Sequence, residues 1–305
     1  MANDTSELQA RIDSGKQIVI AELSPPKSGN GTQVRERARR YAGKVHALGV
    51  SDNRDGAAMS ALAAASLVQQ EGVEAILHVV TRDRNRIALI SECLGAQALD
   101  INNILCTTGT HQTLGPARSA KNVFDIDSIQ LLQSYTRLSS DGALVGEECF
   151  EGAGPYCLGA AISQHADPIE MQVIRLAKKI EAGARFVITQ PVFDIERFRT
   201  FWDDVVKHGL HEKVAVIAGV RPLTDAVAAK AYADSRPNPR VPEHIVERLG
   251  SKKGATEQEA EGVALAVETV EMLSGTEGLR GFAIEGGGND RAAMSVISKC
   301  GLGVS

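Results

Sequence analysis

The feature that most constrains the fold of this chain is a regular alternation of short apolar segments with longer amphipathic ones. Apolar runs of four to eight residues that are rich in Val, Ile and Ala predict buried strands. Eight such runs lie at residues 17–23, 46–51, 74–81, 103–108, 158–163, 186–190, 214–219 and 281–285.

Segments with helical periodicity occupy the intervals between these runs. They lie at residues 32–48, 57–71, 85–99, 126–138, 169–182, 194–208, 225–233, 241–249, 256–273 and 290–299. Strands that alternate with helices form a parallel sheet covered by helices, and eight units favour closure into an α/β fold of the (β/α)8 TIM barrel type. The alternative, an open doubly wound sheet, requires a glycine-rich turn directly after the first strand. Glu22-Leu23-Ser24-Pro25-Pro26 stands there instead, so the barrel is the preferred fold.

Length and composition narrow the class of protein. A TIM barrel takes about 250 residues, so we expect one domain over residues 1–305. The net charge is −5 and no segment clusters Lys and Arg with aromatic residues, which argues against nucleic-acid binding. The polar residues 1–10 do not form a signal peptide, and no apolar run approaches the ~20 residues of a membrane span. We therefore expect a cytoplasmic protein.

The cysteines are scattered and do not predict a metal site. Cys93, Cys106, Cys149, Cys157 and Cys300 form no CxxC pair and show no ligand spacing for zinc or an iron–sulfur cluster. We expect reduced thiols and no metal in this chain.

Polar residues cluster where the predicted strands end, and the active site of a TIM barrel forms at those ends. This ring of carboxylate, imidazole, amide and guanidinium groups suits a polar heterocyclic ligand. For any one position the alternative is that a polar residue at a strand end simply avoids burial. The ring consists of Glu22, Ser51–Asn53, His78, Gly109–His111, Ser163–His165, Gln190, Arg221 and Glu285–Asn289.

Three members of the ring carry the functional hypothesis. Glu22 lies between apolar residues and is followed by two prolines, so a functional carboxylate is favoured over a surface one. His78 lies within an apolar run and has the alternative of a buried structural histidine. Gln190 has the alternative of merely ending its strand.

Two further patterns have simple structural interpretations. Gly286-Gly287-Gly288 resembles a phosphate-binding loop, which barrels often place after the last strands, but a flexible turn explains it equally well. Lys178 and Lys179 are typical of a solvated helix face.

Several motifs resemble the methylenetetrahydrofolate reductase family over residues 17–302. The most specific is Ala182-Gly183-Ala184 followed by Ile188-Thr189-Gln190 and Phe193-Asp194, which matches the family's sixth-strand run. The segment from Ala21 to Pro26 is similar to its first-strand signature, and Gly219-Val220-Arg221-Pro222 to its seventh-strand segment. His78 stands at the position of the family's third-strand histidine.

The resemblance implies a flavoenzyme that reduces 5,10-methylenetetrahydrofolate to 5-methyltetrahydrofolate, with FAD, or alternatively FMN, in the barrel mouth. By position, Glu22 matches the acid that assists opening of the five-membered folate ring, and apolar surroundings would help it to hold a proton. Gln190 matches the amide that binds the pterin, and Thr110 and His111 fall in the substrate-binding segment. The positions implied for the flavin are Ser51, His78, Thr108, Gly109, His165 and Lys179.

A branch of the family is also suggested. Ser51-Asp52-Asn53, Arg82 to Asn85 and Val123 to Asp127 resemble reductases of anaerobes with one-carbon pathways. Such enzymes serve the Wood–Ljungdahl pathway or methionine biosynthesis, and often work beside a zinc- or iron–sulfur-bearing partner subunit. The resemblance thus implies electrons from NAD(P)H or from such a partner, and an oligomer.

The sequence departs from the family pattern in two places. The family usually has Gly-Asp after the fourth strand, where this chain has Gly109-Thr110 followed by His111. Bulkier apolar residues usually precede the asparagine that matches Asn289, where this chain has three glycines. The first departure removes a charge near the flavin and pterin, and the second opens space beside the flavin.

These departures leave two alternatives to a self-sufficient reductase. The first is a flavin-binding electron-transfer subunit that needs a partner. The second is a barrel corrinoid methyltransferase that binds methyl-folate without redox chemistry and holds no flavin. Glu22 and Gln190 favour the reductase, because an electron conduit needs neither a ring-opening acid nor a pterin ligand.

Overall fold

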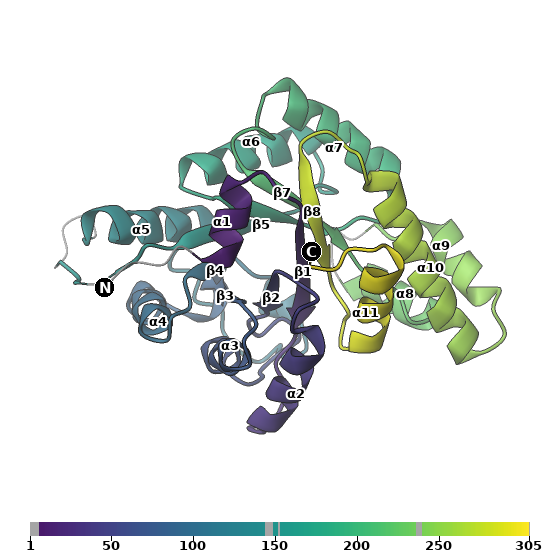
Figure 1. Cartoon of the computed structure of the whole chain (residues 1–305), viewed down its shortest axis with the longest axis horizontal. Helices are drawn as coiled ribbons and strands as arrows, with labels where there is room; N and C mark the ends of the chain where they lie inside the picture. The colour runs from purple at the N-terminus through teal and green to yellow at the C-terminus, as the bar shows by residue number, and fades with distance from the viewer. Residues whose placement is uncertain (1–5, 144–148, 152, 236–239, 305) are drawn as a thin grey trace.

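The computed structural model describes residues 6–143, 149–151, 153–235 and 240–304. Its strands are parallel and pair in chain order, and β8 pairs with β1 to close a barrel (Figure 1). The predicted (β/α)8 TIM barrel is confirmed. The strands are β1 (Ile18–Leu23), β2 (Ala47–Val50), β3 (Ala75–Val80), β4 (Asn103–Thr107), β5 (Cys157–Ile162), β6 (Phe186–Pro191), β7 (Ala215–Val220) and β8 (Leu279–Ile284).

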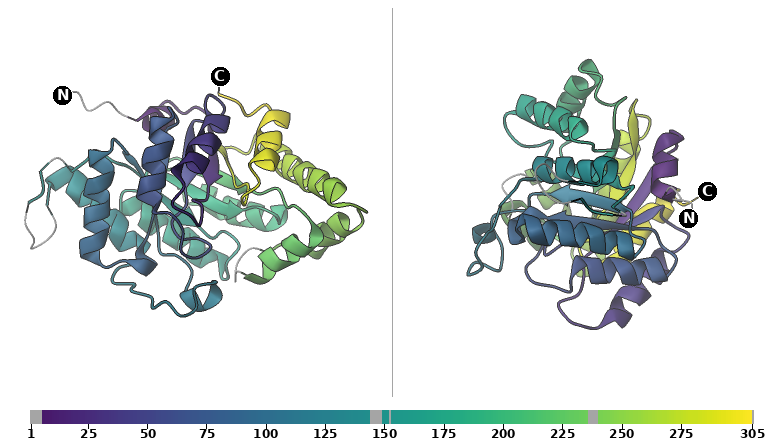
Figure 2. Two further views of the ribbon diagram at one scale, coloured as in Figure 1. Left: turned by 90° about the horizontal axis from the view of Figure 1, so that it is seen from below. Right: turned by 90° about the vertical axis from the view of Figure 1, so that its left-hand side faces the viewer.

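Helices surround the barrel (Figure 1 and Figure 2). They are α1 (Glu7–Asp13), α2 (Gly31–Tyr41), α3 (Ala61–Gln70), α4 (Arg86–Ala98), α5 (Ser128–Asp141), α6 (Ile169–Glu181), α7 (Ile195–Lys207), α8 (Ala226–Ser235), α9 (Glu243–Gly250), α10 (Ala255–Leu273) and α11 (Asp290–Lys299). Two 3-10 helices, η1 (Thr81–Asp83) and η2 (Gln112–Leu114), lie in loops after β3 and β4.

The predicted helices at 32–48 and 57–71 are too long. The first ends at Tyr41, because Ala42 takes the extended ψ of 127° and the chain then turns into β2. The second begins only at Ala61. Alanine-rich segments keep helical periodicity beyond the true ends of a helix, and loop contacts decide where the helix starts.

Helix α1 was not predicted, and it closes the amino-terminal end of the barrel. Its buried Leu8 and Ile12 belong to the same apolar cluster as inward-facing Ile18 and Phe186. The opposite end, at the carboxyl termini of the strands, is therefore the end that holds the candidate site.

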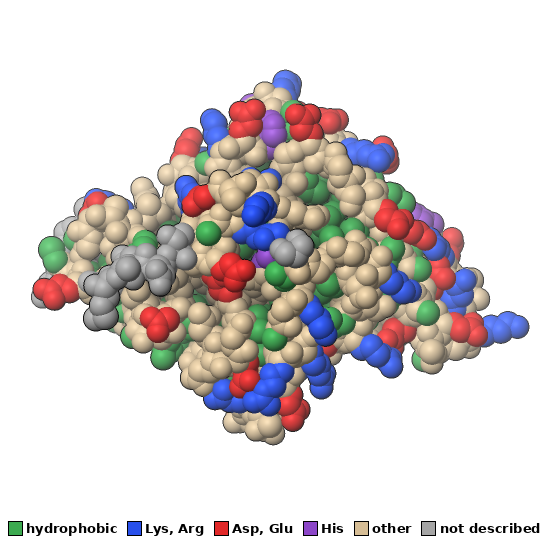
Figure 3. All heavy atoms as spheres, in the orientation of Figure 1, with side chains coloured by type: hydrophobic (Ala, Val, Ile, Leu, Met, Phe, Trp, Pro, Cys, Tyr) green, Lys and Arg blue, Asp and Glu red, His purple; other side chains and the backbone are tan. Residues whose placement is uncertain are grey.

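Figure 3 shows one face of the surface, and the described residues on this face form no extended patch of Lys and Arg alone, as the sequence predicts. Acidic and basic side chains are interspersed there, without a field of one sign. Within the described residues, none of the helices is both long enough and apolar enough to span a membrane.

Candidate active site at the barrel mouth

Strand periodicity places the polar side chains inside the barrel. Because side chains alternate between the two faces of a strand, Glu22, His78 and Gln190 share the inward face of β1, β3 and β6 with the apolar residues that precede them by two positions. Those residues are Ile20, Ile76 and Ile188, and all belong to the interior cluster. Apolar layers thus fill the barrel, and on the inward face of each of these strands a polar side chain follows the apolar one.

These residues line one cavity of about 490 Å³ at the mouth. Most of the predicted site residues contribute to its wall, namely Glu22, Ser51, His78, Thr108, Gly109, Thr110, His111, Lys179 and Gln190. His165 does not line the cavity. It is 1% exposed, and its Nε2 lies 3.1 Å from the Pro191 carbonyl oxygen, behind the end of β6.

A carboxylate–guanidinium–carboxylate cluster crosses the mouth. Arg54 Nη1 lies 2.5 Å from Glu22 Oε1, and Arg54 Nη2 lies 2.7 Å from Glu285 Oε2. Burial of Arg54 disfavours its charge, but Glu22 and Glu285 outweigh that effect and raise its pKa well above the ordinary value. Arg54 was not predicted as a site residue, because its partners are remote in sequence.

His78 extends into the mouth because its neighbour on β2 is a glycine. A Cβ at Gly49 would lie 2.9 Å from His78 Nε2. Burial, and next the charge of Arg54, lower the pKa of His78 to about 4, so the ring is neutral at physiological pH. Its buried Nε2 has no hydrogen-bond partner among the described residues.

Gln190 has its backbone fixed and its side-chain amide oxygen free. The Gln164 side chain donates to the Gln190 carbonyl at 2.7 Å and accepts from the Gln190 N–H at 3.1 Å. The buried Gln190 Oε1 has no partner in the described part of the chain. Gln190 therefore presents an amide acceptor to the cavity from a rigid strand end.

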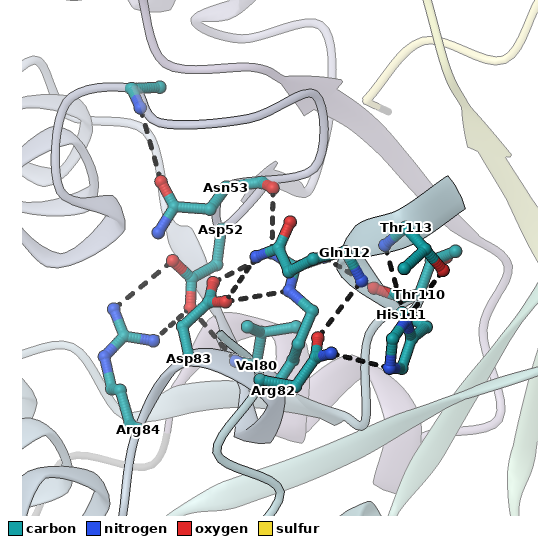
Figure 4. Close-up of polar contacts among 12 residues, drawn as sticks. Asp52, Asn53, Val80, Arg82, Asp83, Arg84, Thr110, His111, Gln112 and Thr113 are labelled. Atoms are coloured by element: carbon teal, nitrogen blue, oxygen red, sulfur yellow. Dashed lines mark hydrogen bonds and ion pairs between the residues drawn. The ribbon is translucent and has the colours of Figure 1, made fainter. Parts of the chain in front are cut away.

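Arg82 ties together the loops that carry the other side of the site (Figure 4). It donates from Nη1 to the Thr110 carbonyl oxygen and from Nη2 to the Asn53 carbonyl oxygen, both at 3.0 Å. Its side chain is 5% exposed and also pairs with Asp83. The loops after β2 and β4 are thus fixed through one buried guanidinium, which the sequence did not indicate.

The segment that departs from the family pattern is held mainly by contacts within its own loop. His111 Nδ1 lies 2.8 Å from Thr113 Oγ1, and His111 Nε2 lies 2.7 Å from Asn122 Nδ2 (Figure 4 shows the first contact). The ring also stacks on Phe124. Thr110 is exposed at the cavity wall, so this loop presents no carboxylate to the cavity.

Lys179 differs from its neighbour Lys178. Lys178 is exposed, as a solvated helix face requires, but Lys179 turns its ammonium inward to donate to the Ala161 carbonyl oxygen on β5. Burial, and then the charge of Arg175, lower the pKa of Lys179 to about 8. The solvated-face interpretation is therefore wrong for Lys179.

The glycine run after β8 forms a turn that leaves room for an arginine. A Cβ on Gly287, whose φ is +59°, would lie 2.2 Å from Arg221 Nη2. The Arg221 guanidinium stacks 4.4 Å from the centre of the Tyr232 ring and lies 3.8 Å from Glu285 Oε2. Arg221 thus fills the space beside Gly287, whereas a Cβ on Gly288 would meet no atom within 4 Å.

No group of three or more His, Cys, Asp or Glu side chains in the described ranges is arranged to hold a metal ion. The wall instead combines two ion-paired glutamates, a neutral histidine, a lysine and an amide. These features define a class: a TIM-barrel protein with a polar cavity at the carboxyl ends of its strands, where barrels of this type place their ligand sites.

The comparison with protein families identifies the group within that class. The family model described as methylenetetrahydrofolate reductase matches residues 7–301. The chain belongs to the methylenetetrahydrofolate reductase family, which confirms the resemblance seen in the sequence.

Individual relatives match in part. A probable methylenetetrahydrofolate reductase (NADPH) of Caenorhabditis elegans is 26% identical over 251 residues, which are 79% of this chain and 36% of that protein. The 5,10-methylenetetrahydrofolate reductase of Escherichia coli K12 is 30% identical over 122 residues, 40% of either chain. The matches thus span about two fifths or less of these two relatives.

A solved structure shares the fold. It is described as an uncharacterized protein from Clostridium thermocellum that binds two copies of 5-methyl-5,6,7,8-tetrahydrofolic acid. It superposes with a TM-score of 0.65 at 14% identity and covers 97% of this chain and 98% of that one. At this identity the likeness supports the fold alone.

Proposed function

We propose that this protein reduces 5,10-methylenetetrahydrofolate to 5-methyltetrahydrofolate with a flavin, FAD or alternatively FMN, held in the barrel mouth. The observation that carries the proposal is the pair of buried, unpartnered polar atoms, His78 Nε2 and Gln190 Oε1, which belong to residues lining the same cavity as Glu22. Buried polar atoms are normally hydrogen-bonded, so a ligand with a polar edge fits this wall.

The residues present fit a flavin. The neutral His78 offers one nitrogen to a ring heteroatom, and Ser51, Thr108 and Gly109 line the same wall. Lys179 supplies a positive charge for an anionic group of the cofactor. His165 lies behind the wall and acts on the cofactor only through neighbouring backbone. When bound, a flavin supplies the hydride for the reduction.

The protein's own groups prepare the folate. Opening of the five-membered ring leaves an iminium carbon, and the departing amine nitrogen takes a proton, which we assign to Glu22. Arg54 fixes the direction of that carboxyl group through its 2.5 Å contact. Gln190 binds the pterin through its free amide oxygen, and Thr110 and His111 border the substrate side.

An anaerobic titration tests the proposal. The purified protein should carry a flavin absorbance that bleaches with NADH or NADPH and recovers with methylenetetrahydrofolate, with 5-methyltetrahydrofolate as product. Recovery with folate after chemical reduction, but no bleaching by either nicotinamide, would indicate that a partner subunit supplies the electrons. A colourless protein that still binds methyl-folate would contradict the flavin and favour a methyl-transfer role.

A further inference from the structure

Two glutamates lie side by side at the mouth. Ala21 on β1 pairs in register with Ile284 on β8, so Glu22 and Glu285 follow at adjacent positions of neighbouring parallel strands. Like charges on adjacent strands repel each other. Arg54 binds one oxygen of each and compensates that repulsion.

The carboxylates in the cavity wall differ in how many of their oxygens already have a hydrogen-bond partner. Asp52 is fully used, because it accepts from the Val80 N–H and pairs through both oxygens with Arg84. Glu22 and Glu285 each use one oxygen, Oε1 and Oε2 respectively. Their second oxygens accept no hydrogen bond within the described ranges and remain available to a ligand.

The surroundings assign different roles to these two glutamates. Glu285 pairs with two guanidinium groups, those of Arg54 at 2.7 Å and Arg221 at 3.8 Å. Two positive neighbours stabilise a negative carboxylate, and an ionised carboxylate only accepts hydrogen bonds. Glu22 has one such neighbour, which suits a group that must also carry a proton.

The pterin ring of folate has an edge that matches Glu285. Its 2-amino group and its N3–H are adjacent donors, and Oε1 of Glu285, the oxygen that Arg54 does not hold, is an acceptor for the 2-amino group. We propose that Glu285 binds this edge and selects for the 2-amino group, with Arg54 as the positioning residue that fixes its carboxylate; this inference rests on the proposed function.

Binding of two matched ligands tests the inference without turnover. The ligands are 5-methyltetrahydrofolate and its analogue with a methyl group in place of the 2-amino group. Calorimetric Kd values for the wild type should favour the natural ligand by roughly 10- to 100-fold, the range for hydrogen bonds to a charged acceptor. Glu285→Leu should abolish that preference, and Glu285→Gln, which keeps the shape, should reduce it.

Variants at other positions show whether the preference for the 2-amino group depends on Glu285 and Arg54 in particular. Glu259→Gln removes a carboxylate that pairs with Arg291 on the surface, and it should keep the full preference. Arg54→Met should lower the preference, and Arg54→Lys should partly restore it.

A wild-type protein that binds neither ligand would overturn the proposed function itself. A wild type that binds and discriminates, with Glu285→Leu keeping the preference or weakening both ligands equally, would overturn only the role of Glu285.

Discussion

Replacement of Arg54 by methionine removes a positive charge that contacts both glutamates at the barrel mouth, Glu22 and Glu285. The side chains of Arg54, Glu22 and Glu285 are only 19%, 16% and 9% exposed. Breaking a buried ion pair costs about 3–5 kcal/mol. Because Glu285 keeps Arg221 at 3.8 Å, we expect a loss of about 3 kcal/mol in the free energy of unfolding near pH 8.

Urea unfolding followed by circular dichroism near pH 8 measures the loss of stability in the Arg54→Met variant. Arg248→Met is the matched control, because Arg248 also bridges two glutamates, Glu261 and Glu268, but is 39% exposed. The Arg248→Met variant should lose less than about 1 kcal/mol in the free energy of unfolding. Equal losses of stability in the two variants would refute a buried charge cluster at the barrel mouth.

Three other predictions concern residues at the barrel mouth. Because the pKa of His78 is about 4 in the folded protein and about 6.5 in unfolded chains, wild type should lose about 3 kcal/mol of stability as pH falls from 6.5 to 4. In urea unfolding, His78→Gln should not show this loss of stability between pH 6.5 and 4. If the free energy of unfolding depends on pH in the variant as it does in wild type, the burial of a neutral ring is contradicted. Because the pKa of Lys179 is about 8, flavin affinity in equilibrium dialysis should weaken above pH 8 in wild type but not in Lys179→Arg; parallel profiles would contradict a charge contact. Gly287→Ala should displace Arg221 and weaken folate binding severalfold. Gly288→Ala also strains a backbone of positive φ (+94°) but meets no atom within 4 Å, so it should weaken binding less; equal effects would point to backbone strain alone.

The barrel and its inner polar layer were predictable because they follow from local patterns. Eight apolar runs give the strands, and the period of two places Glu22, His78 and Gln190 on the inward face. The same rule explains why His165 lies elsewhere. It stands three residues beyond the end of β5, where a loop and not the strand period sets its direction.

Contacts between remote residues were not predictable in this way. Arg54 meets partners 32 and 231 residues away, and Arg82 bridges loops that only the closed barrel brings together. Neither arginine belongs to a local motif that marks such a role. The inward turn of Lys179 also depends on the packing of α6 against β5.

Single-turnover stopped-flow shows whether Glu22 is the acid for folate reduction. Flavin in wild type and in Glu22→Gln is first reduced anaerobically and then mixed with methylenetetrahydrofolate or with a simple electron-accepting dye. A general acid contributes about 10²- to 10⁴-fold, so reoxidation by folate should slow by at least about 100-fold in the variant, with reoxidation by the dye unchanged. Equal rates of reoxidation by folate in the two proteins would remove Glu22 from the mechanism.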